Sequence, residues 1–202
     1  MEWTPLTCRR RRDDLRPVRL FFSVPVPDEA RPLASGALRE MKRAAGDAPL
    51  SWTKDVQLHY TLAFLGEQPE EALPRLREAA APCAALHEFW LSLSGAGAFP
   101  NSRRPRVLWL GAGEGARELE ELASCLQRGL RSAGFALEER PFRAHLTVAR
   151  VKPGGERAAS RALAAAPQGE IARMRVDRLS LMQSKLSPQG ATHAVVHDVR
   201  LG

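Results

Sequence analysis

The sequence predicts an α+β protein built from two similar lobes, and three observations lead to this fold class. Segments rich in β-branched and aromatic residues alternate with segments in which leucine and alanine recur at helical spacing. The order strand, helix, strand, helix occurs twice along the 202 residues. The second strand of each repeat carries histidine followed two residues later by threonine. We therefore expect a duplicated fold in which each lobe is a sheet with helices on one face.

The first repeat begins with a strand over residues 18–26, "VRLFFSVPV", where aromatic and β-branched residues end at prolines. Asp28 is a suitable N-cap for the helix that follows. That helix carries Leu33, Ala37, Leu38 and Met41. Residues 56–66, "VQLHYTLAFLG", form the next predicted strand, which a glycine closes. Residues 69–86 are rich in alanine and leucine and predict a second helix, although two internal prolines blur its ends.

The second repeat has the same order. Residues 106–113, "RVLWLGAG", predict a strand, and a glycine at position 134 ends the helix after it. The helix is indicated by the spacing of Leu119, Leu122, Leu126 and Leu130. Residues 142–151, "FRAHLTVARV", form the matching strand, and residues 155–167 a short helix. The remaining predicted strands are residues 88–99, 174–184 and 192–201.

The paired His-x-Thr strands predict a site. Successive side chains of a strand alternate between its two faces, so His59 and Thr61 share one face. The apolar residues Leu58, Tyr60, Leu62 and Phe64 are expected on the other face. The same alternation places His145 beside Thr147. If the two lobes face each other about a pseudo-twofold axis, the four polar groups converge in one cleft.

Two histidines and two hydroxyls suit the chemistry of phosphate esters. One neutral imidazole can take a proton from water while the other, as imidazolium, donates a proton to the leaving oxygen. Threonine hydroxyls can bind the non-bridging phosphate oxygens and hold the phosphorus in line. The near symmetry of the pair leaves open which histidine is the donor. No cofactor or metal is required by this scheme.

Other kinds of site are less well supported by the sequence. A single His-x-Thr is a weak motif, and His87, His193 and His197 are predicted to be structural or solvated. Neither motif has a nearby third ligand for zinc, because there is no His-x-His, HExxH or CxxC. "GAGEG", residues 111–115, lacks the Gly-Lys-Ser/Thr ending of a P-loop and the spacing of a dinucleotide fingerprint, and no GxSxG nucleophile elbow occurs.

The composition of the chain limits which binding partners and which cellular compartment are expected. The net charge of +7 favours a polyanionic partner, although 30 basic and 23 acidic residues are also typical of an arginine-rich surface. Arginine is concentrated in residues 101–106 and 140–161, near the second motif. Three widely spaced cysteines suggest reduced thiols, and the start of the chain lacks the apolar stretch of a secretory signal. We expect a cytoplasmic protein with no membrane span.

The motifs and their surroundings resemble the 2H phosphoesterase superfamily, in particular its RNA 2′,3′-cyclic phosphodiesterases, also called 2′-5′ RNA ligases. The similar segments lie in the family's order between residues 18 and 201 and include "LHYTLAFLGE", "ERPFRAHLTVARV" and "LMQSKLSPQGATHAVV". Ala144 stands where the family often has proline, and His193 near where it often has tyrosine. Residues 1–16 lie outside the resemblance and are expected to be a basic, disordered tail, with residues 17–202 forming one bilobal domain.

The resemblance implies two antiparallel sheets facing a central cleft, with helices on the outer faces. It implies hydrolysis of a ribose 2′,3′-cyclic phosphate to a 2′-phosphate, with His59 as proton donor to O3′ and His145 as proton acceptor. Thr61 and Thr147 then bind the phosphate. By strand alternation Arg143 shares the face of His145 and is a candidate for phosphate contact, whereas Arg150 is expected on the opposite face.

The expected partner is RNA or an oligonucleotide with a 2′,3′-cyclic phosphate end, bound by a monomer that needs no cofactor, metal or obligate protein partner. Two other functions stay open at this point. Joining of RNA ends through a 2′-5′ linkage is the reverse reaction at the same site. A non-catalytic RNA-binding module would use the basic cleft alone, but two intact His-x-Thr motifs argue against it.

Overall fold

The computed structural model of the chain describes residues 17–187 and 190–202. Within these residues the strands are β1 (Val18–Pro25), β2 (Leu50–Trp52), β3 (His59–Gln68), β4 (Phe89–Phe99), β5 (Val107–Ala112), β6 (His145–Val151), β7 (Glu170–Val176), β8 (Arg178–Ser187) and β9 (Gly190–Arg200). The helices are α1 (Arg31–Ala45), α2 (Leu73–Ala80), α3 (Ala116–Ser132) and α4 (Glu156–Ala164), with short 3₁₀ turns η2 (Asp55–Gln57), η3 (Glu70–Ala72) and η4 (Ala81–Ala85).

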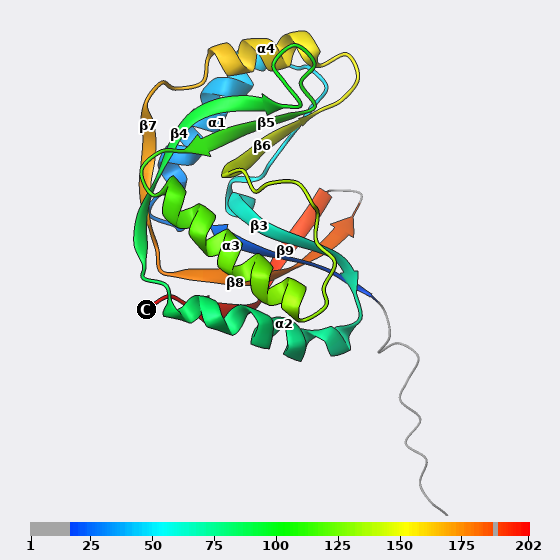
Figure 1. Cartoon of the computed structure of the whole chain (residues 1–202). Coiled ribbons are helices and arrows are strands. Elements are labelled where there is room, and N and C mark those ends of the chain that lie inside the picture. The colour runs from blue at the N-terminus through cyan, green and yellow to red at the C-terminus, as the bar shows by residue number, and fades with distance from the viewer. Residues whose placement is uncertain (1–16, 188–189) are drawn as a thin grey trace, which may run out of the picture.

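The strands form two antiparallel halves that are continuous with each other. The order across the described sheet is β7-β4-β5-β6-β3-β1-β8-β9, with β2 added beside β6. The two halves meet between β6 and β3, where Tyr60 and Leu146 are the one residue pair that joins these strands within the described residues. On either side of this junction the sheet curls, so that the halves lie at an angle to each other (Figure 1). The α+β, two-lobed architecture expected from the sequence is confirmed.

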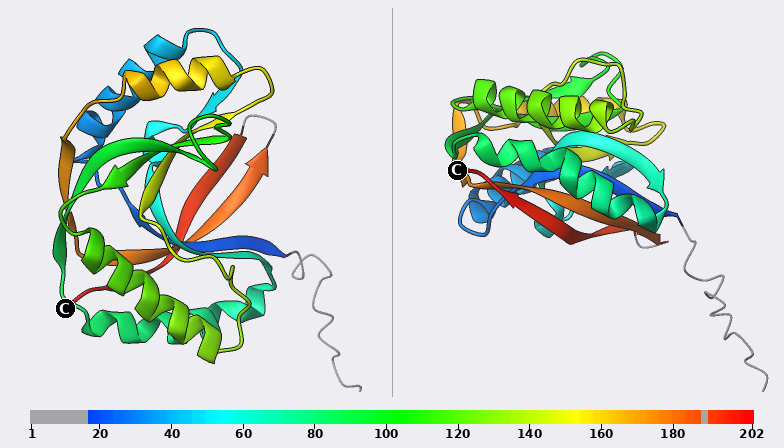
Figure 2. Two further views of the ribbon diagram at one scale, coloured as in Figure 1. Left: turned by 45° about the horizontal axis from the view of Figure 1, so that its top comes forward. Right: turned by 60° about the horizontal axis from the view of Figure 1, so that its bottom comes forward.

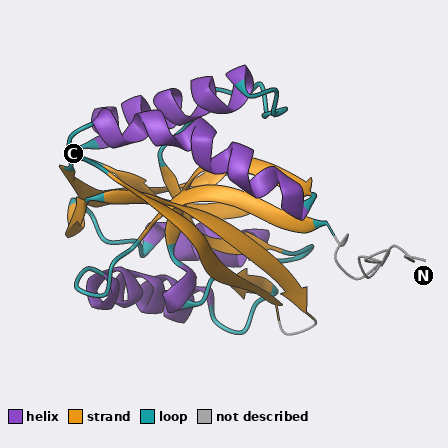
Figure 3. Ribbon diagram, turned by 90° about the horizontal axis from the view of Figure 1, so that it is seen from below, coloured by secondary structure: helices purple, strands orange, loops and turns teal. Residues whose placement is uncertain are grey.

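The helices cover the outer sides of the two halves. Each half is covered by one helix from the first sequence repeat and one from the second. Helix α1 packs against α4 on the half that contains β4 to β7, while α2 and α3 cover the half that contains β1, β3, β8 and β9 (Figures 1 and 2). Arg161 of α4 ties the first pair by donating to the carbonyls of Ala44 and Ala45. Seen from below, the strands lie between the two helix pairs (Figure 3). Each lobe thus combines strands and helices from both sequence repeats.

Side-chain alternation explains where the core lies. Leu20, Phe22 and Val24 of β1 are at most 2% exposed and pack under the helices. The four leucines of α3 that the sequence singled out are fully buried, which confirms the predicted apolar face of that helix. Helix α3 ends before Gly134, whose φ of 82° is easily adopted only by glycine. The helices therefore cover the apolar face of each half-sheet, and the opposite face of the sheet borders the cleft.

Several predicted boundaries are wrong, each for a local reason. The single strand expected over residues 174–184 is divided at Asp177 into β7 and β8, which pair with β4 and β1 in opposite halves. Asp28 does not cap α1; the cap is Ala30, and Asp28 instead forms an ion pair with Arg31 at 2.5 Å. The helix expected over residues 69–86 is broken into η3, α2 and η4, because prolines interrupt it.

Two other expectations concern cysteines and membranes. Cys83 and Cys125 are both free thiols, and burial raises the pKa of Cys83 to about 12, with a further rise from its hydrogen bond to Cys125. Cys8 and the predicted tail, residues 1–16, lie outside the described residues. None of the helices in the described ranges is long and apolar enough to cross a membrane.

Candidate active site

The two histidine motifs are held by the same local bond. His59 lies 2.7 Å from the carbonyl oxygen of Gln57, measured from Nδ1, and His145 lies at the same distance from the carbonyl of Arg143. A carbonyl can only accept, so Nδ1 of each ring must carry a hydrogen and donate it. This fixes the tautomer: Nε2, on the far side of the ring from the strand, is the nitrogen left for chemistry. Both histidines are half-buried at the start of a strand.

The junction between the halves brings the four predicted groups together. Tyr60 and Leu146 pair in antiparallel fashion and point into the core. The residues next to them therefore lie on the cleft face, with His59 and Thr147 on one side of the pair and Thr61 and His145 on the other. The hydroxyl of Tyr60 also donates to the carbonyl of Gly111 at 2.8 Å, which locks β3 to β5 beneath the site. The structure thus places the two motifs side by side on one face of the sheet at the junction of its halves.

Each threonine has an unsatisfied donor as its cross-strand neighbour. Thr61 is paired with Ser23, whose side chain is fully buried, and Thr147 is paired with Trp109. Ser23 Oγ and Trp109 Nε1 are buried and have no hydrogen-bond partner among the described residues. The Trp109 ring lies so close to Gly97 that a Cβ there would come within 2.2 Å of it. Donors without partners beside two hydroxyls are well suited to an anion or to ordered water.

A β-bulge follows the threonine in both motifs and changes which residues face the cleft. In β3, Leu62 is the extra residue between Thr61 and Ala63, and in β6 Val148 is the extra residue at the corresponding place. Two residues then oppose one on the neighbouring strand, and the alternation of faces shifts by one.

The bulges correct two predictions made from regular alternation. Phe64 was expected in the core but is 53% exposed, and its ring lies 6.0 Å from that of Phe21. Arg150 was expected on the core face, but it pairs with Val107 and is exposed on the cleft face of β6. Both changes add cleft residues that the sequence analysis assigned elsewhere. A signal was present: Ala63 and Ala149 are small, apolar residues where alternation called for a polar one.

Aromatic rings line both sides of the histidines. The Phe99 ring meets His145 edge-on with centroids 4.9 Å apart, and the Phe21 ring lies 5.0 Å from His59. His193, which was predicted to be structural or solvated, lies in the site: its ring is 5.3 Å from that of His59. The pairing of β9 with β8, and of β8 with β1, brings it there, and no local sequence pattern indicates this contact.

A cavity of about 630 Å³ opens beside the second motif. Thr61, His145 and Arg143 line it, so the structure brings these three predicted residues together. Its wall also contains Phe64, Phe99, Phe142, Arg106, Arg140 and Gln127. Aromatic faces and guanidinium groups next to the histidines are the groups that bind nucleobases and phosphates.

Burial controls the charge state of the first motif. Burial lowers the pKa of His59 to about 4; the bond to Gln57 partly opposes this, and the charges of His193 and His145 lower it further. Burial also lowers the pKa of His193. In the described part of the chain no three His, Cys, Asp or Glu side chains are grouped so as to hold a metal ion.

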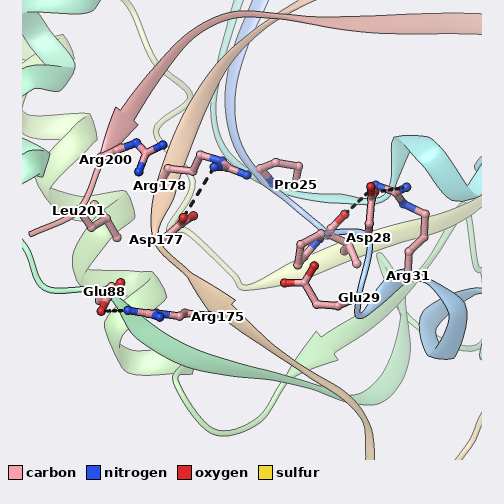
Figure 4. Close-up of a pocket in the computed structure, with 12 residues that line it drawn as sticks. Pro25, Asp28, Glu29, Arg31, Glu88, Arg175, Asp177, Arg178, Arg200 and Leu201 are labelled. Atoms are coloured by element: carbon pink, nitrogen blue, oxygen red, sulfur yellow. Dashed lines mark hydrogen bonds and ion pairs between the residues drawn. The ribbon is translucent and has the colours of Figure 1, made fainter.

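A second cavity, of about 600 Å³, has no residue of either motif in its wall. Its charged residues are four arginines and four acids, and most of them pair with one another (Figure 4). Arg178 lies 3.7 Å from Asp177, and Arg175 is bound to Glu88. Because the charges largely compensate, this cavity offers no excess charge to a polyanion. The cleft between the two motifs is the candidate active site.

The fold and the paired His-x-Thr strands define a 2H phosphoesterase. The family model of the 2′-5′ RNA ligase superfamily matches residues 26–187, and the chain belongs to this superfamily. An RNA 2′,3′-cyclic phosphodiesterase of Archaeoglobus fulgidus is 37% identical over 175 residues, which cover 86% of this chain and 94% of that protein. The enzyme of the same name from Aeropyrum pernix is 35% identical over 155 residues, covering 75% and 86%.

Solved structures show the same fold. TT0787 of Thermus thermophilus matches with a TM-score of 0.72 and 29% identity, over 91% of this chain and 97% of that one. Escherichia coli LigT in complex with 3′-AMP matches with a TM-score of 0.71 and 26% identity, over 92% and 98%. Each alignment covers more than nine-tenths of this chain, so both halves of the sheet are included.

Proposed function

We propose that the protein hydrolyses RNA ends that carry a 2′,3′-cyclic phosphate, leaving a 2′-phosphate. The observation that carries this proposal is the arrangement of the two motifs around the Tyr60–Leu146 pair, with each imidazole turned by the same carbonyl bond. The names of the curated relatives support the substrate class. Because the described sheet contains both motifs, one chain supplies the complete site, and we propose that a monomer is active.

In the proposed reaction, Nε2 of neutral His145 takes a proton from water while the water oxygen bonds to phosphorus. The bond from phosphorus to O3′ breaks, and Nε2–H of protonated His59 donates its proton to O3′. The net change is addition of one water molecule across the P–O3′ bond. The Nδ1 bonds to Gln57 and Arg143 persist throughout, so neither ring has to turn between the two steps.

The threonine hydroxyls are proposed to donate to the non-bridging phosphate oxygens, as Thr61 and Thr147 lie diagonally across the junction from each other. Arg150, brought to the cleft face by the bulge, and Arg143, in the wall of the cavity, add positive charge near this position. The aromatic and arginine-rich cavity supports a polynucleotide substrate rather than a small phosphate ester, because aromatic rings stack on bases and guanidinium groups bind backbone phosphates.

The low pKa of His59 sets a condition for its role as donor. In the free enzyme at neutral pH His59 is neutral, because its pKa is about 4. A bound cyclic phosphate carries a negative charge, which favours the imidazolium and raises the pKa of His59. Substrate binding is therefore proposed to let His59 take up from solvent the proton that it later donates to O3′. The donor and acceptor roles are taken from the family resemblance. The mechanism is proposed to be metal-independent because acid–base catalysis by two histidines requires no metal ion.

The proposal is tested by incubating the purified protein with a dinucleotide that ends in a 2′,3′-cyclic phosphate. Product analysis by ³¹P NMR distinguishes a 2′-phosphate from a 3′-phosphate. We expect the 2′-phosphate alone, in amounts that are the same with and without EDTA. A 3′-phosphate product would contradict the assigned bond cleavage, and no turnover would favour a binding role. A ligated product with a 2′-5′ linkage would show that the reverse reaction competes.

A further inference from the structure

His193 is part of a cluster of three rings at the first motif. Its ring lies edge-on to both Phe21 and His59, with centroids 5.0 Å and 5.3 Å away. Phe21 in turn contacts His59 at 5.0 Å, so each ring of the cluster contacts the other two. Since Nδ1 of His59 is bound to the backbone, lateral contacts with Phe21 and His193 are what limit tilting of the ring.

Gln57 connects the strand that carries His193 to the strand that carries His59. Its backbone carbonyl accepts the hydrogen of His59 Nδ1, and its side-chain amide donates to the carbonyl of Ala191, two residues before His193. One residue thus positions the His59 ring and secures the start of β9 next to it. The position of His193 is therefore set by the same residue that sets His59.

The electrostatic surroundings of the pair are simple. His193 Nδ1 is buried and has no hydrogen-bond partner in the described part of the chain. The charged groups that act on His59 are His193 of β9 and His145 of β6. On the same sheet face, Arg19 of β1 is exposed, and Asp198 of β9 is bound to the hydroxyl of Ser180. Asp198 is not among the charges that act on His59, so no acid among these groups offsets a proton on either histidine ring.

We propose that His193 is a positioning residue of the active site, which holds the His59 ring against Phe21 and makes the protonation of His59 depend on the charge of His193. A proton on either ring opposes a proton on the other until an anion enters the cleft. Burial lowers the pKa of both rings and so also disfavours their protonated forms. This inference rests on the proposed function for its catalytic consequence, but the coupling between the two rings does not.

Kinetics of His193 variants test the positioning role. We expect His193→Ala to lower kcat on the cyclic dinucleotide about tenfold with a smaller change in KM, because the His59 ring is free to tilt. His193→Phe keeps a ring at the contact and should retain kcat within about threefold of the wild type. His197→Ala is the matched control, since His197 is also half-buried on β9 but pairs with Leu181 away from His59. An unchanged kcat in His193→Ala, or an equal loss in His193→Phe, would overturn the positioning role.

NMR titration of the His59 ring tests the coupling. In His193→Gln, which conserves polarity without a charge, the titration midpoint of His59 should move to higher pH, and in His197→Ala it should stay in place. An unmoved midpoint in His193→Gln would overturn the coupling. The titration needs no turnover, so a shifted midpoint in a protein that hydrolyses no cyclic phosphate would refute the proposed function alone. His193→Phe and His193→Gln keep most of the side-chain volume and supply the test if His193→Ala does not fold.

Discussion

His59 and His145 illustrate how much of the site is decided within a few residues of chain. Each ring is oriented by the carbonyl two positions earlier, and each is followed two positions later by a threonine on the same face. Such an arrangement needs only an extended backbone, so it can be inherited with a short sequence motif. Local bonds alone therefore turn Nε2 of each ring away from the backbone.

Replacing either histidine with alanine is expected to abolish most turnover while leaving the fold intact. Both rings lie on the cleft face and not in the core, and loss of an acid or base costs about 10²- to 10⁴-fold in rate. The measurement is kcat on a cyclic-phosphate dinucleotide, with circular dichroism to check folding. His87→Ala, at an exposed position, is the control. Near-wild-type turnover in either variant would remove that histidine from the mechanism.

The threonine variants Thr61→Ala and Thr147→Ala should be milder. Each removes one hydrogen bond to the phosphate and leaves both proton transfers in place, so the loss should stay below the roughly 2.7–4 kcal/mol typical of an oxyanion donor. Single-turnover rates of the two variants and of the double variant measure this. If one threonine variant were as inactive as His59→Ala, the ranking would be wrong.

Acid should destabilise the fold through His59. Its pKa is about 4 in the folded protein against 6.5 when unfolded, so between these values the unfolded chain binds more protons. The contribution of His59 to the free energy of unfolding is therefore fully present above pH 6.5. It is lost as the pH falls toward 4, by on the order of 1 kcal/mol per pH unit at most. Urea unfolding of His59→Gln should show a shallower fall than wild type, whereas exposed His87→Gln should match wild type. Equal slopes in wild type and His59→Gln would contradict the assigned shift.

At the scale of single elements, the bulges in β3 and β6 are the feature that sequence alternation misses. Each inserts one residue after the threonine, which buries two successive apolar residues and turns the next side chain to the cleft. In this way Phe64 and Arg150 join the site. That both halves contain a bulge at the same place is consistent with their duplication and indicates that it serves the site.

Helix packing makes its own prediction at Gly129 of α3. A Cβ at this position would lie 2.1 Å from the carbonyl oxygen of Ala79 in α2, so the two helices would have to move apart. We expect Gly129→Ala to lower the free energy of unfolding by about 1–3 kcal/mol. Gly36→Ala in α1 is the matched control, because its nearest atom is an arginine side-chain nitrogen at 3.8 Å. The control should be neutral or stabilising by about 0.5–1 kcal/mol. Equal unfolding midpoints would show that α2 and α3 adjust freely.

For the whole molecule, the decisive feature is that the two halves are joined at the site. The Tyr60–Leu146 pair and the bond from the Tyr60 hydroxyl to Gly111 connect the lobes next to the two His-x-Thr motifs. Each lobe also borrows a helix from the other repeat, since α1 packs with α4. The relative position of the histidines is therefore set by the packing of the entire chain.

A two-histidine mechanism predicts a bell-shaped dependence of kcat on pH that does not change in EDTA. Both limbs belong to the coupled pair and report macroscopic pKa values. Removing the base should abolish the acidic limb and removing the acid the alkaline limb, which identifies the donor wherever residual rates can be measured. Activity lost in EDTA and restored by zinc or manganese would overturn the mechanism.

The sequence by itself determined the α+β class, most of the strands and helices, and the pairing of two His-x-Thr motifs. These features depend on periodicity and local bonds, which a short window of residues contains. It also indicated the family, because several motifs occur in a fixed order along the chain. The predicted apolar stripe of α3 was confirmed for the same reason.

Tertiary structure alone decided which distant residues complete the site. The division of residues 174–184 between the two lobes, and the approach of His193 to His59, depend on how β7, β8 and β9 pair with strands far away in the sequence. The faces of Phe64 and Arg150 depend on bulges, which are set by register between strands and not by the spacing within one. The pKa of His59 is lowered chiefly by burial, and burial exists only once both halves have folded around the cleft.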